Sequence, residues 1–413
     1  ADLWLTTSST IPKRDRLEAR SPDGIRQDAV LMAQATLPAK PADDVASQPV
    51  VDESALRYFA GKGDKVRLQA EIVRLQTLYP DWTPPTDPMA GRENADPQLA
   101  SMWKLYSEAK LAELRQKIAA RQASEPGWKA PADLLNRLLV AEKRVALIAG
   151  SDARKYADVV ALAAQTPSLL TCSDVDVLWR VADAFAHTDR LERAEDAYGY
   201  ILQNCTKPAE RLATVQKASA VLDYSRMQSL LGLEKKRPDG TGEFEPVADD
   251  LARRFVAEGG DNSELVVAKP YIDRVAQSLG KQANAADALL LGWYFIKRQD
   301  MPAAEQYFRK AHQINDSASA SQGLALTLIA KKDAQQAENV MYRWRASSAE
   351  ASATYFAATA NLLGIEPPPV LDADVLGRIA ASTTTGKDVK TGEQFGWYAV
   401  AFHQPKTAAQ WFR

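Results

Sequence analysis

The fold is decided by two stretches with nearly the same pattern, LGWYFIKRQDMPAAEQYF at 291–308 and FGWYAVAFHQPKTAAQWF at 395–412. Each contains Gly-Trp-Tyr, an alanine twelve positions after the glycine, and an aromatic residue sixteen positions after it. Small residues recur at fixed positions where the two helices of a hairpin approach closely, and a large aromatic side chain fills the space beside each contact. The pattern therefore predicts a helix, a short turn and a second helix in each stretch.

Two further segments repeat this spacing with two small residues and one large one. They are SQGLALTLIAKKDAQQAENVMY, with Ala325, Ala337 and Met341, and VLWRVADAFAHTDRLERAEDAYGYIL, with Ala182, Ala194 and Tyr198. Ala325 follows Gly292 by 33 positions. From Leu56 onward apolar residues recur at helical spacing, and no segment alternates polar and apolar residues for long enough to predict a sheet. The sequence predicts an all-α chain.

A second repeat consists of YPDWTPPTD at 79–87 and EPGWKAPAD at 125–133, which share Pro-x-Trp-x-x-Pro-x-Asp at an offset of 46 positions. A proline inside a helix loses a hydrogen bond and clashes with the preceding turn, at a cost of about 3 kcal/mol or more. The motif therefore ends one helix and holds the next segment extended. We predict that Trp82 and Trp128 pack back on the helix pair just finished, and that Asp87 and Asp133 cap the following helix. A tryptophan that contacts a carbohydrate or a peptide is the alternative.

A period near 34 residues with small, small and aromatic side chains at these offsets resembles the tetratricopeptide repeat. The resemblance covers 175–208, 285–350 and 388–413, and extends loosely over 55–170 and 209–284. It implies an all-α, right-handed α-solenoid of tetratricopeptide and tetratricopeptide-like hairpins. We expect four regions: an extended, linker-like segment at 1–50, irregular hairpins with the Pro-Trp junctions at 51–170, tetratricopeptide-like hairpins at 171–284, and tetratricopeptide repeats at 285–413, in an array truncated at residue 413.

The resemblance also implies a partner groove, because tetratricopeptide arrays bind through a concave face lined by first-helix side chains. The positions that line this face correspond here to Trp179, Asp183 and His187, to Leu289, Trp293, Ile296 and Lys297, to Gln322 and Leu326, and to Glu393 and Trp397. From these we select as candidate groove residues Trp179, Asp183, Trp293, Lys297 and Trp397. We expect the three tryptophans to pack against the neighbouring repeat; the alternative is that they stack on sugar rings or receive apolar peptide side chains.

Cys172 and Cys205 are the only two cysteines, and they flank one predicted hairpin. In the antiparallel helix pair that the resemblance implies, the two positions are neighbours. A disulfide needs Cα atoms within about 7 Å, and closing this loop would stabilise the fold by about 3–4 kcal/mol. Such a bond would place the protein in an oxidising compartment, in bacteria the periplasm. The alternative is a pair of buried free thiols that behave as small apolar residues.

Composition and motifs exclude several classes of function. The formal net charge is −2 and the pI is near 6.1, which gives no basic surface for nucleic acid. No apolar run reaches the ~18 residues that span a bilayer. The three histidines, His187, His312 and His403, fall in different units without metal-ligand spacing, and no nucleophile elbow, phosphate-binding loop or dinucleotide fingerprint occurs. We expect a protein that is not an enzyme and holds no metal or cofactor.

Three functions follow from the resemblance. The first is a non-catalytic periplasmic scaffold that binds protein partners and a polysaccharide chain. Such arrays look like the periplasmic part of exopolysaccharide and cellulose biosynthesis and secretion machines, in which an outer-membrane domain follows the repeats; this step is family analogy. The second is the superhelical, non-catalytic region of a peptidoglycan-cleaving enzyme such as a lytic transglycosylase. The third is a tetratricopeptide adaptor in the cytosol, that is, in the cytoplasm, with reduced cysteines.

Overall fold

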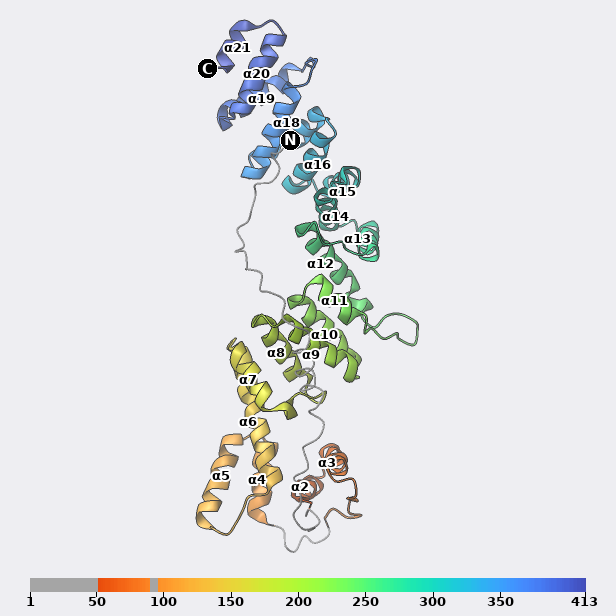
Figure 1. Ribbon diagram of the computed structural model, residues 1–413, viewed down its shortest axis with the longest axis vertical. Coiled ribbons are helices and arrows are strands. Elements are labelled where there is room, and N and C mark those ends of the chain that lie inside the picture. The colour runs from red at the N-terminus through yellow and green to blue at the C-terminus, as the bar shows by residue number, and fades with distance from the viewer. Residues whose placement is uncertain (1–50, 90–95) are drawn as a thin grey trace, which may run out of the picture. The chain divides into compact units, whose positions relative to one another are not determined.

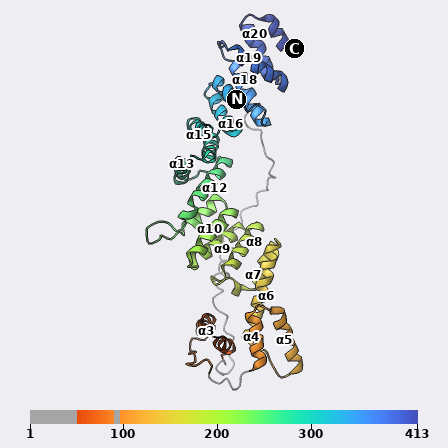
Figure 2. The same cartoon turned by 180° about the vertical axis from the view of Figure 1, so that it is seen from behind.

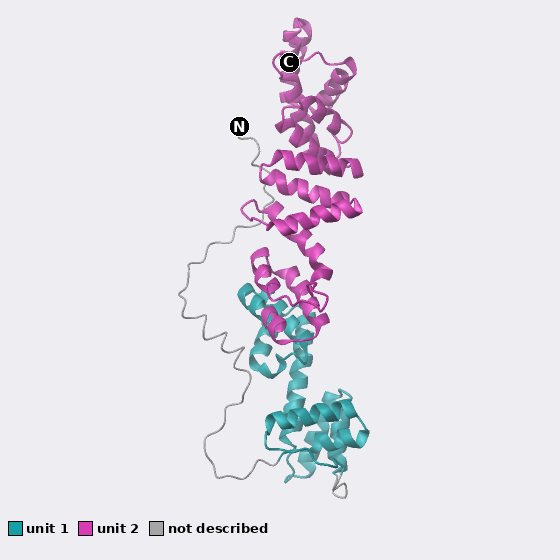
Figure 3. Cartoon of the chain, turned by 90° about the vertical axis from the view of Figure 1, so that its right-hand side faces the viewer, with its two compact units in different colours: residues 1–197 teal, residues 198–413 magenta. Residues whose placement is uncertain are grey.

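The computed structural model describes residues 51–89 and 96–413, and Figure 1 labels its helices. The predicted extended segment at 1–50 lies outside the described residues. Within the described part there are 20 α-helices and no strand, only an isolated bridge between Lys236 and Gly242. The chain divides into two compact units, 1–197 and 198–413, which Figure 3 colours separately. The all-α prediction is confirmed, and the finer division into four regions stays a prediction.

The first unit consists of helices that follow one another as antiparallel pairs. Their bounds are α2 (Ser54–Lys62), α3 (Lys65–Leu78), α4 (Pro97–Ser107), α5 (Leu111–Ser124), α6 (Ala132–Asp152), α7 (Tyr156–Gln165), the short 3-10 turn η3 (Pro167–Leu169) and α8 (Val175–His187); α9 (Leu191–Asn204) has residues in both units. Within this unit α2 packs on α3, α4 on α5 and α6 on α7, while α2 also contacts α4 and α6 also contacts α8.

The second unit continues the same arrangement with shorter connections. Its bounds are α10 (Pro208–Val221), α11 (Tyr224–Leu231), η4 (Glu245–Val247), α12 (Ala248–Asp261), α13 (Lys269–Gln282), α14 (Ala285–Lys297), α15 (Met301–Ile314), α16 (Ala318–Ala330), α17 (Ala334–Tyr342), α18 (Ala349–Leu363), α19 (Ala373–Gly386), α20 (Val389–Ala401) and α21 (Pro405–Trp411).

Helices α12, α14, α16, α18 and α20 form a continuous row in the second unit. Helices α12, α14, α16 and α20 each pack against the second helix of their own hairpin, and each helix of the row packs against the next one. Figures 1 and 2 show these hairpins following one another in chain order from two opposite sides. A hairpin that contacts only its neighbours in this way is the unit of an α-solenoid. The predicted tetratricopeptide-like solenoid is therefore confirmed, and its handedness stays a prediction.

The small–small–aromatic spacing marks the closest contact inside each hairpin. Gly292 and Ala304 are buried beside Phe308, and a Cβ atom added at Gly292 would lie only 2.7 Å from Cε1 of the Phe308 ring. The same ring also faces Gly323 of α16, so Phe308 fills the space between one hairpin and the next. Gly396 meets Phe412 in the same way. These glycines are required because a side chain would occupy the volume of the ring.

Six of the hairpin turns share one backbone conformation, and none of these six contains a glycine. In each of six three-residue turns the middle residue has a positive φ, between 55° and 67°, and the next residue donates its N–H to the carbonyl five positions earlier. This is the Schellman termination of a helix. The middle residues are Ala109, Arg154, Asp189, Gln299, Lys332 and His403. The turn recurs in α4–α5 and α6–α7, so these hairpins are closed like those with the clear repeat.

The Pro-Trp motifs join hairpins as predicted, but their aspartates do not cap helices. Trp82 donates its indole N–H to Glu53 at 3.0 Å, just before α2, and the Trp128 ring lies 4.3 Å from the Arg121 guanidinium of α5. Both indoles therefore pack back on the preceding helix pair. Asp87 accepts from the nearby backbone N–H of Met89, and Asp96 caps α4 instead.

Asp133 fails as a cap because α6 begins at Ala132, so that its carboxylate lies inside the first helical turn. It forms ion pairs with Arg137 at 2.9 Å and with Arg74 at 3.2 Å. The residue at the capping position is Pro131, whose side chain has no acceptor.

Candidate partner-binding surface

Apart from Lys297 and Gln322, the predicted groove positions on α14 and α16 carry apolar side chains that are only partly buried. Leu289, Trp293 and Ile296 of α14 and Ile329 of α16 pack with one side against the cluster around Phe308. Leu326 of α16, at the register position of Trp293, is also half-buried. Because these apolar side chains are only partly buried, each leaves some apolar surface in contact with solvent. This row of five side chains, the α14–α16 face, can receive apolar groups of a partner.

Trp293 has both of the roles considered for it. Its ring meets the Phe308 ring edge to face, with centroids 5.0 Å apart, so part of the indole belongs to the hairpin core. The remainder is exposed on the α14–α16 face. Lys297, one turn further along α14, is exposed and adds a positive charge at one end of the face.

Trp397 lies on α20 and is 56% exposed. Its ring meets that of Phe412 at 5.2 Å. Helices α16 and α18 lie between α14 and α20 in the row, so Trp397 and Trp293 do not form one site. The two tryptophans therefore belong to separate hairpins of the row, and their place on one concave face stays a prediction.

Trp179 and Asp183 lie on α8 in the first unit. Trp179 is half-buried, and the Asp183 carboxylate lies 3.3 Å from Nδ1 of His187. The His187 ring stacks on Tyr156 with centroids 4.3 Å apart. Asp183 and His187 thus interact with each other at the end of α8.

The row contains two further hairpins, of which the resemblance covered the one that begins with α12 only loosely and the one that begins with α18 almost not at all. Gly259 of α12 precedes Gly292 by 33 positions, and Ala358 of α18 follows Ala325 by the same interval. Both are buried, and a Cβ atom at Gly259 would lie 2.9 Å from the Tyr294 ring. The 33-residue interval could have revealed them. Longer connections after α12 and α18 shift the second helix, so the alanine and aromatic offsets are lost.

Ser321, His312 and Asp316 lie together, but their geometry is not that of a nucleophilic relay. Ser321 Oγ lies 3.3 Å and Asp316 Oδ1 3.2 Å from the same nitrogen, Nδ1 of His312. A relay needs the nucleophile and the carboxylate on opposite ring nitrogens, and Ser321 is fully buried. Asp316 also accepts from the indole of Trp344 at 2.9 Å and from Arg343 at 2.9 Å. The cluster joins α15, α16 and the end of α17.

These contacts change the pKa of Asp316. Burial raises the pKa, but hydrogen bonds from Trp344 and Ser321, with the nearby His312 and Arg343, outweigh that effect and lower it below the usual value. His187 ends α8, His403 lies in a hairpin turn and His312 lies late in α15, as the repeat register predicts. In the described part of the chain no group of histidine, cysteine and carboxylate side chains could hold a metal ion.

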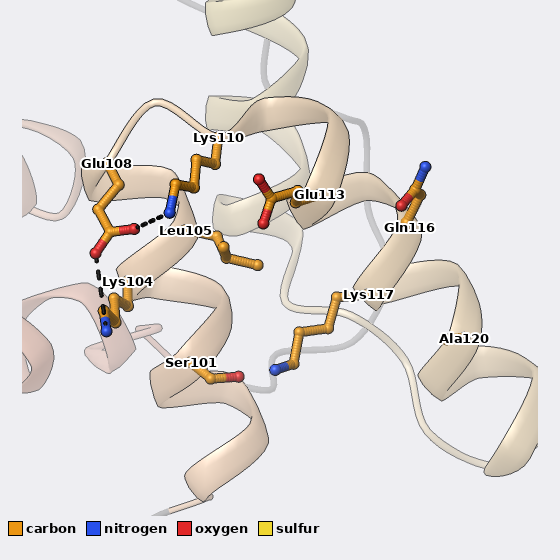
Figure 4. Close-up of a pocket in the computed structure, with 9 residues that line it drawn as sticks. All are labelled: Ser101, Lys104, Leu105, Glu108, Lys110, Glu113, Gln116, Lys117 and Ala120. Atoms are coloured by element: carbon orange, nitrogen blue, oxygen red, sulfur yellow. Dashed lines mark ion pairs between the residues drawn. The ribbon is translucent and has the colours of Figure 1, made fainter.

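A shallow depression between α4 and α5 is lined mainly by charged side chains (Figure 4). Glu108 lies 3.0 Å from Lys110 and 3.8 Å from Lys104. The hydrogen bond from Lys110 lowers the pKa of Glu108. These charges are exposed and paired at the surface, which is ordinary for a solvated helix hairpin.

Cys172 lies between η3 and α8, and Cys205 follows α9 and is buried. Neither cysteine is a free thiol in the structure. Cys172 belongs to the first unit and Cys205 to the second. The disulfide between them stays a prediction. None of the described helices has the length and apolar character to cross a bilayer.

The chain was compared with protein-family models, curated proteins and solved structures. No protein-family model and no curated protein matches the chain. Among solved structures it is similar to the crystal structure of the APC/C hetero-tetramer Cut9-Hcn1, with 12% sequence identity over 87% of this chain and 71% of that one, and a TM-score of 0.24. Such a likeness carries no argument about partners. The helix packing itself makes this a tetratricopeptide-like α-solenoid, a fold typical of non-catalytic scaffolds for protein–protein contacts.

Proposed function

We propose that this chain is a non-catalytic scaffold whose α14–α16 face binds an apolar segment of a protein partner. The supporting observation is the row of partly exposed apolar side chains at groove positions of two consecutive hairpins. Burying their free surface would contribute about 25 cal/mol for each Å² removed from water. Trp293 would be the central anchor, since tryptophans held on a rigid helix dominate the binding energy of many interfaces.

A pair of charge insertions tests this proposal. Leu289→Glu with Leu326→Glu places two carboxylates on the face without removing a fully buried side chain. We expect the affinity for a partner copurified from the native source to fall at least tenfold in a binding titration. Val389→Glu is the matched control, because Val389 is 82% exposed and begins α20, which packs against α18, α19 and α21. An unchanged affinity in the double variant with an intact fold would refute the proposal.

For the wider setting we propose the bacterial periplasm and a role in the synthesis or export of an exopolysaccharide such as cellulose. The chain would then hold protein partners and a polysaccharide, next to an outer-membrane domain. Support comes from the two cysteines, which are not free thiols, and from the exposed indole of Trp397, whose face can stack on a sugar ring.

Mass mapping without reductant and a glycan pull-down test this setting. A peptide linked through Cys172 and Cys205 in protein from the native source supports the periplasm, whereas two alkylated thiols would favour the cytosolic adaptor. Retention on cellulose that is lost in Trp397→Ala supports the glycan. Retention on peptidoglycan in its place would favour the region of a lytic enzyme.

A further inference from the structure

A groove in the first unit runs between α3 and α6. Its floor comes from α2, α4 and the start of α5, and consists mainly of Phe59, Tyr106, Ala109 and Leu111. Its volume is about 470 Å³, within the ~300–1,000 Å³ usual for ligand sites. This groove is independent of the α14–α16 face, which belongs to the other unit.

Four arginines line the groove in two rows. Arg67 and Arg74 belong to α3, and Arg137 and Arg144 belong to α6. The members of each pair are seven residues apart, which places them on one helix face with a rise of about 10 Å between them. Glu71 is the single acidic residue among those that line the groove.

The two inner arginines belong to a neutral ionic square that ties α3 to α6. The buried Glu71 accepts from Arg74 at 2.6 Å and from Arg137, and Asp133 pairs with both guanidinium groups. Burial raises the pKa of both carboxyls. In Glu71 the hydrogen bonds from the two arginines outweigh burial and lower the pKa, whereas in Asp133 burial prevails. Because these charges satisfy one another, the square is structural.

The two outer arginines are more exposed than the inner pair. The Arg67 side chain is 53% exposed and forms an ion pair with Asp64 at 3.6 Å, longer than a hydrogen bond. An exposed pair of this kind contributes about 0–1 kcal/mol, so a carboxylate of a ligand can replace Asp64. Arg144 is 42% exposed and its Nε donates to Asp174, so a carboxylate of a ligand would accept from its remaining N–H groups. Neither aspartate lines the groove.

Aliphatic side chains surround the guanidinium groups. Val145 lines the groove and is 56% exposed. Val66 and Val73 of α3 are 82% and 53% exposed. They line a neighbouring surface that shares Ala70 with the groove. A ligand that covers this region must therefore carry both apolar groups and acceptors for guanidinium.

We infer that this groove binds an acidic and apolar segment of a protein partner. Carboxylates of the segment would bind Arg67 and Arg144, whose planar forks can take a carboxylate bidentately, and an apolar side chain between them would lie on the floor beside Phe59 and Val145. Charge complementarity favours this occupant, because outside the neutral square the lining presents the two outer guanidinium groups and no carboxylate. A neutral polysaccharide would leave the aliphatic rim uncovered.

The test uses a fluorescein-labelled peptide with two glutamates on each side of a Phe-Leu pair, titrated with the full chain and followed by fluorescence anisotropy. We expect saturable binding that weakens as salt rises. The same peptide with glutamines should bind at least tenfold more weakly. The double variant Arg67→Glu with Arg144→Glu should lower the affinity for the acidic peptide at least tenfold, with an unchanged circular dichroism spectrum.

Arg115→Glu is the matched control. Arg115 is 57% exposed, pairs with Glu142 at 2.5 Å in the same unit, and does not line the groove, so its variant should bind the peptide like the native chain. The Leu289→Glu and Leu326→Glu pair should also leave this binding intact, which separates the inference from the proposed function. Equal binding of the glutamine peptide, an equal loss in Arg115→Glu, no saturable binding, or stronger binding of carboxymethyl cellulose than of the peptide would overturn the inference.

Discussion

The close contact at Gly292 predicts that one methyl group has opposite effects at two helical glycines. Replacing glycine by alanine within a helix ordinarily gains about 0.5–1 kcal/mol, because alanine loses less backbone entropy on folding. Gly280 of α13 offers this gain freely, since no atom lies within 4 Å of a Cβ built there. At Gly292 the new Cβ would lie 2.7 Å from the Phe308 ring, where an ordinary carbon contact is ~3.5–4.0 Å.

The Phe308 ring cannot move away without a cost. Gly323 of the next hairpin faces it as well, and Trp293 meets it at 5.0 Å. Overpacking of a buried site typically costs about 1–3 kcal/mol. We therefore expect Gly292→Ala to be less stable than Gly280→Ala by about that amount. Phe308→Leu should reduce the difference, because the smaller side chain leaves room for the methyl group.

Urea unfolding combined with hydrogen exchange measures this difference. Two units need not unfold in one transition, so exchange protection of the α14–α17 peptides gives the local free energy. The protection of the two variants should differ in these peptides and should be the same in the first unit. In a solenoid each hairpin contacts only its neighbours, so the effect of a substitution stays near its site. Equal protection in Gly292→Ala and Gly280→Ala would show that Phe308 does not hold this contact.

Three further predictions concern the turns, a buried carboxylate and the cysteines. Lys332→Gly should stabilise the second unit by about 1 kcal/mol in urea unfolding, because its φ of 67° strains any side chain; Lys331→Gly, at φ −81°, should not. The pKa of Asp316 is lowered, so its stabilisation is present above the unfolded pKa of ~3.9 and is lost as pH falls through the folded value; Asp316→Asn should flatten the acid limb of the melting-temperature profile. If Cys172 and Cys205 are bonded, a reductant should lower the free energy of unfolding by about 3–4 kcal/mol, and an unchanged value would indicate free thiols.

The sequence alone determined the helical class and the hairpins that carry the full repeat. Gly292, Ala304 and Phe308 recur at fixed offsets because two helices touch at one point, and that contact restricts residue size whatever lies around it. The Pro-Trp motifs likewise predicted where helices end, since the restriction on proline is local. The capping role of Asp133 was wrong because α6 begins two residues earlier than predicted, which turns a cap into a first-turn side chain. The capping role of Asp87 was wrong because the next helix begins only at Pro97, where Asp96 is the cap.

Only the tertiary structure decided the turns and the sites. Lys332 and Ala109 adopt a left-handed conformation that their side chains disfavour, so local preference gives no sign of it; the packing of two helices imposes it. The groove arginines come together because long side chains of α3 and α6 meet in the ionic square, in which the Arg137–Glu71 pair spans 66 residues of chain. Which side chains remain exposed, as Trp397 does and Trp293 does only in part, depends on the hairpin that packs next to each. Local pattern specifies the unit, and contacts between units specify the surface.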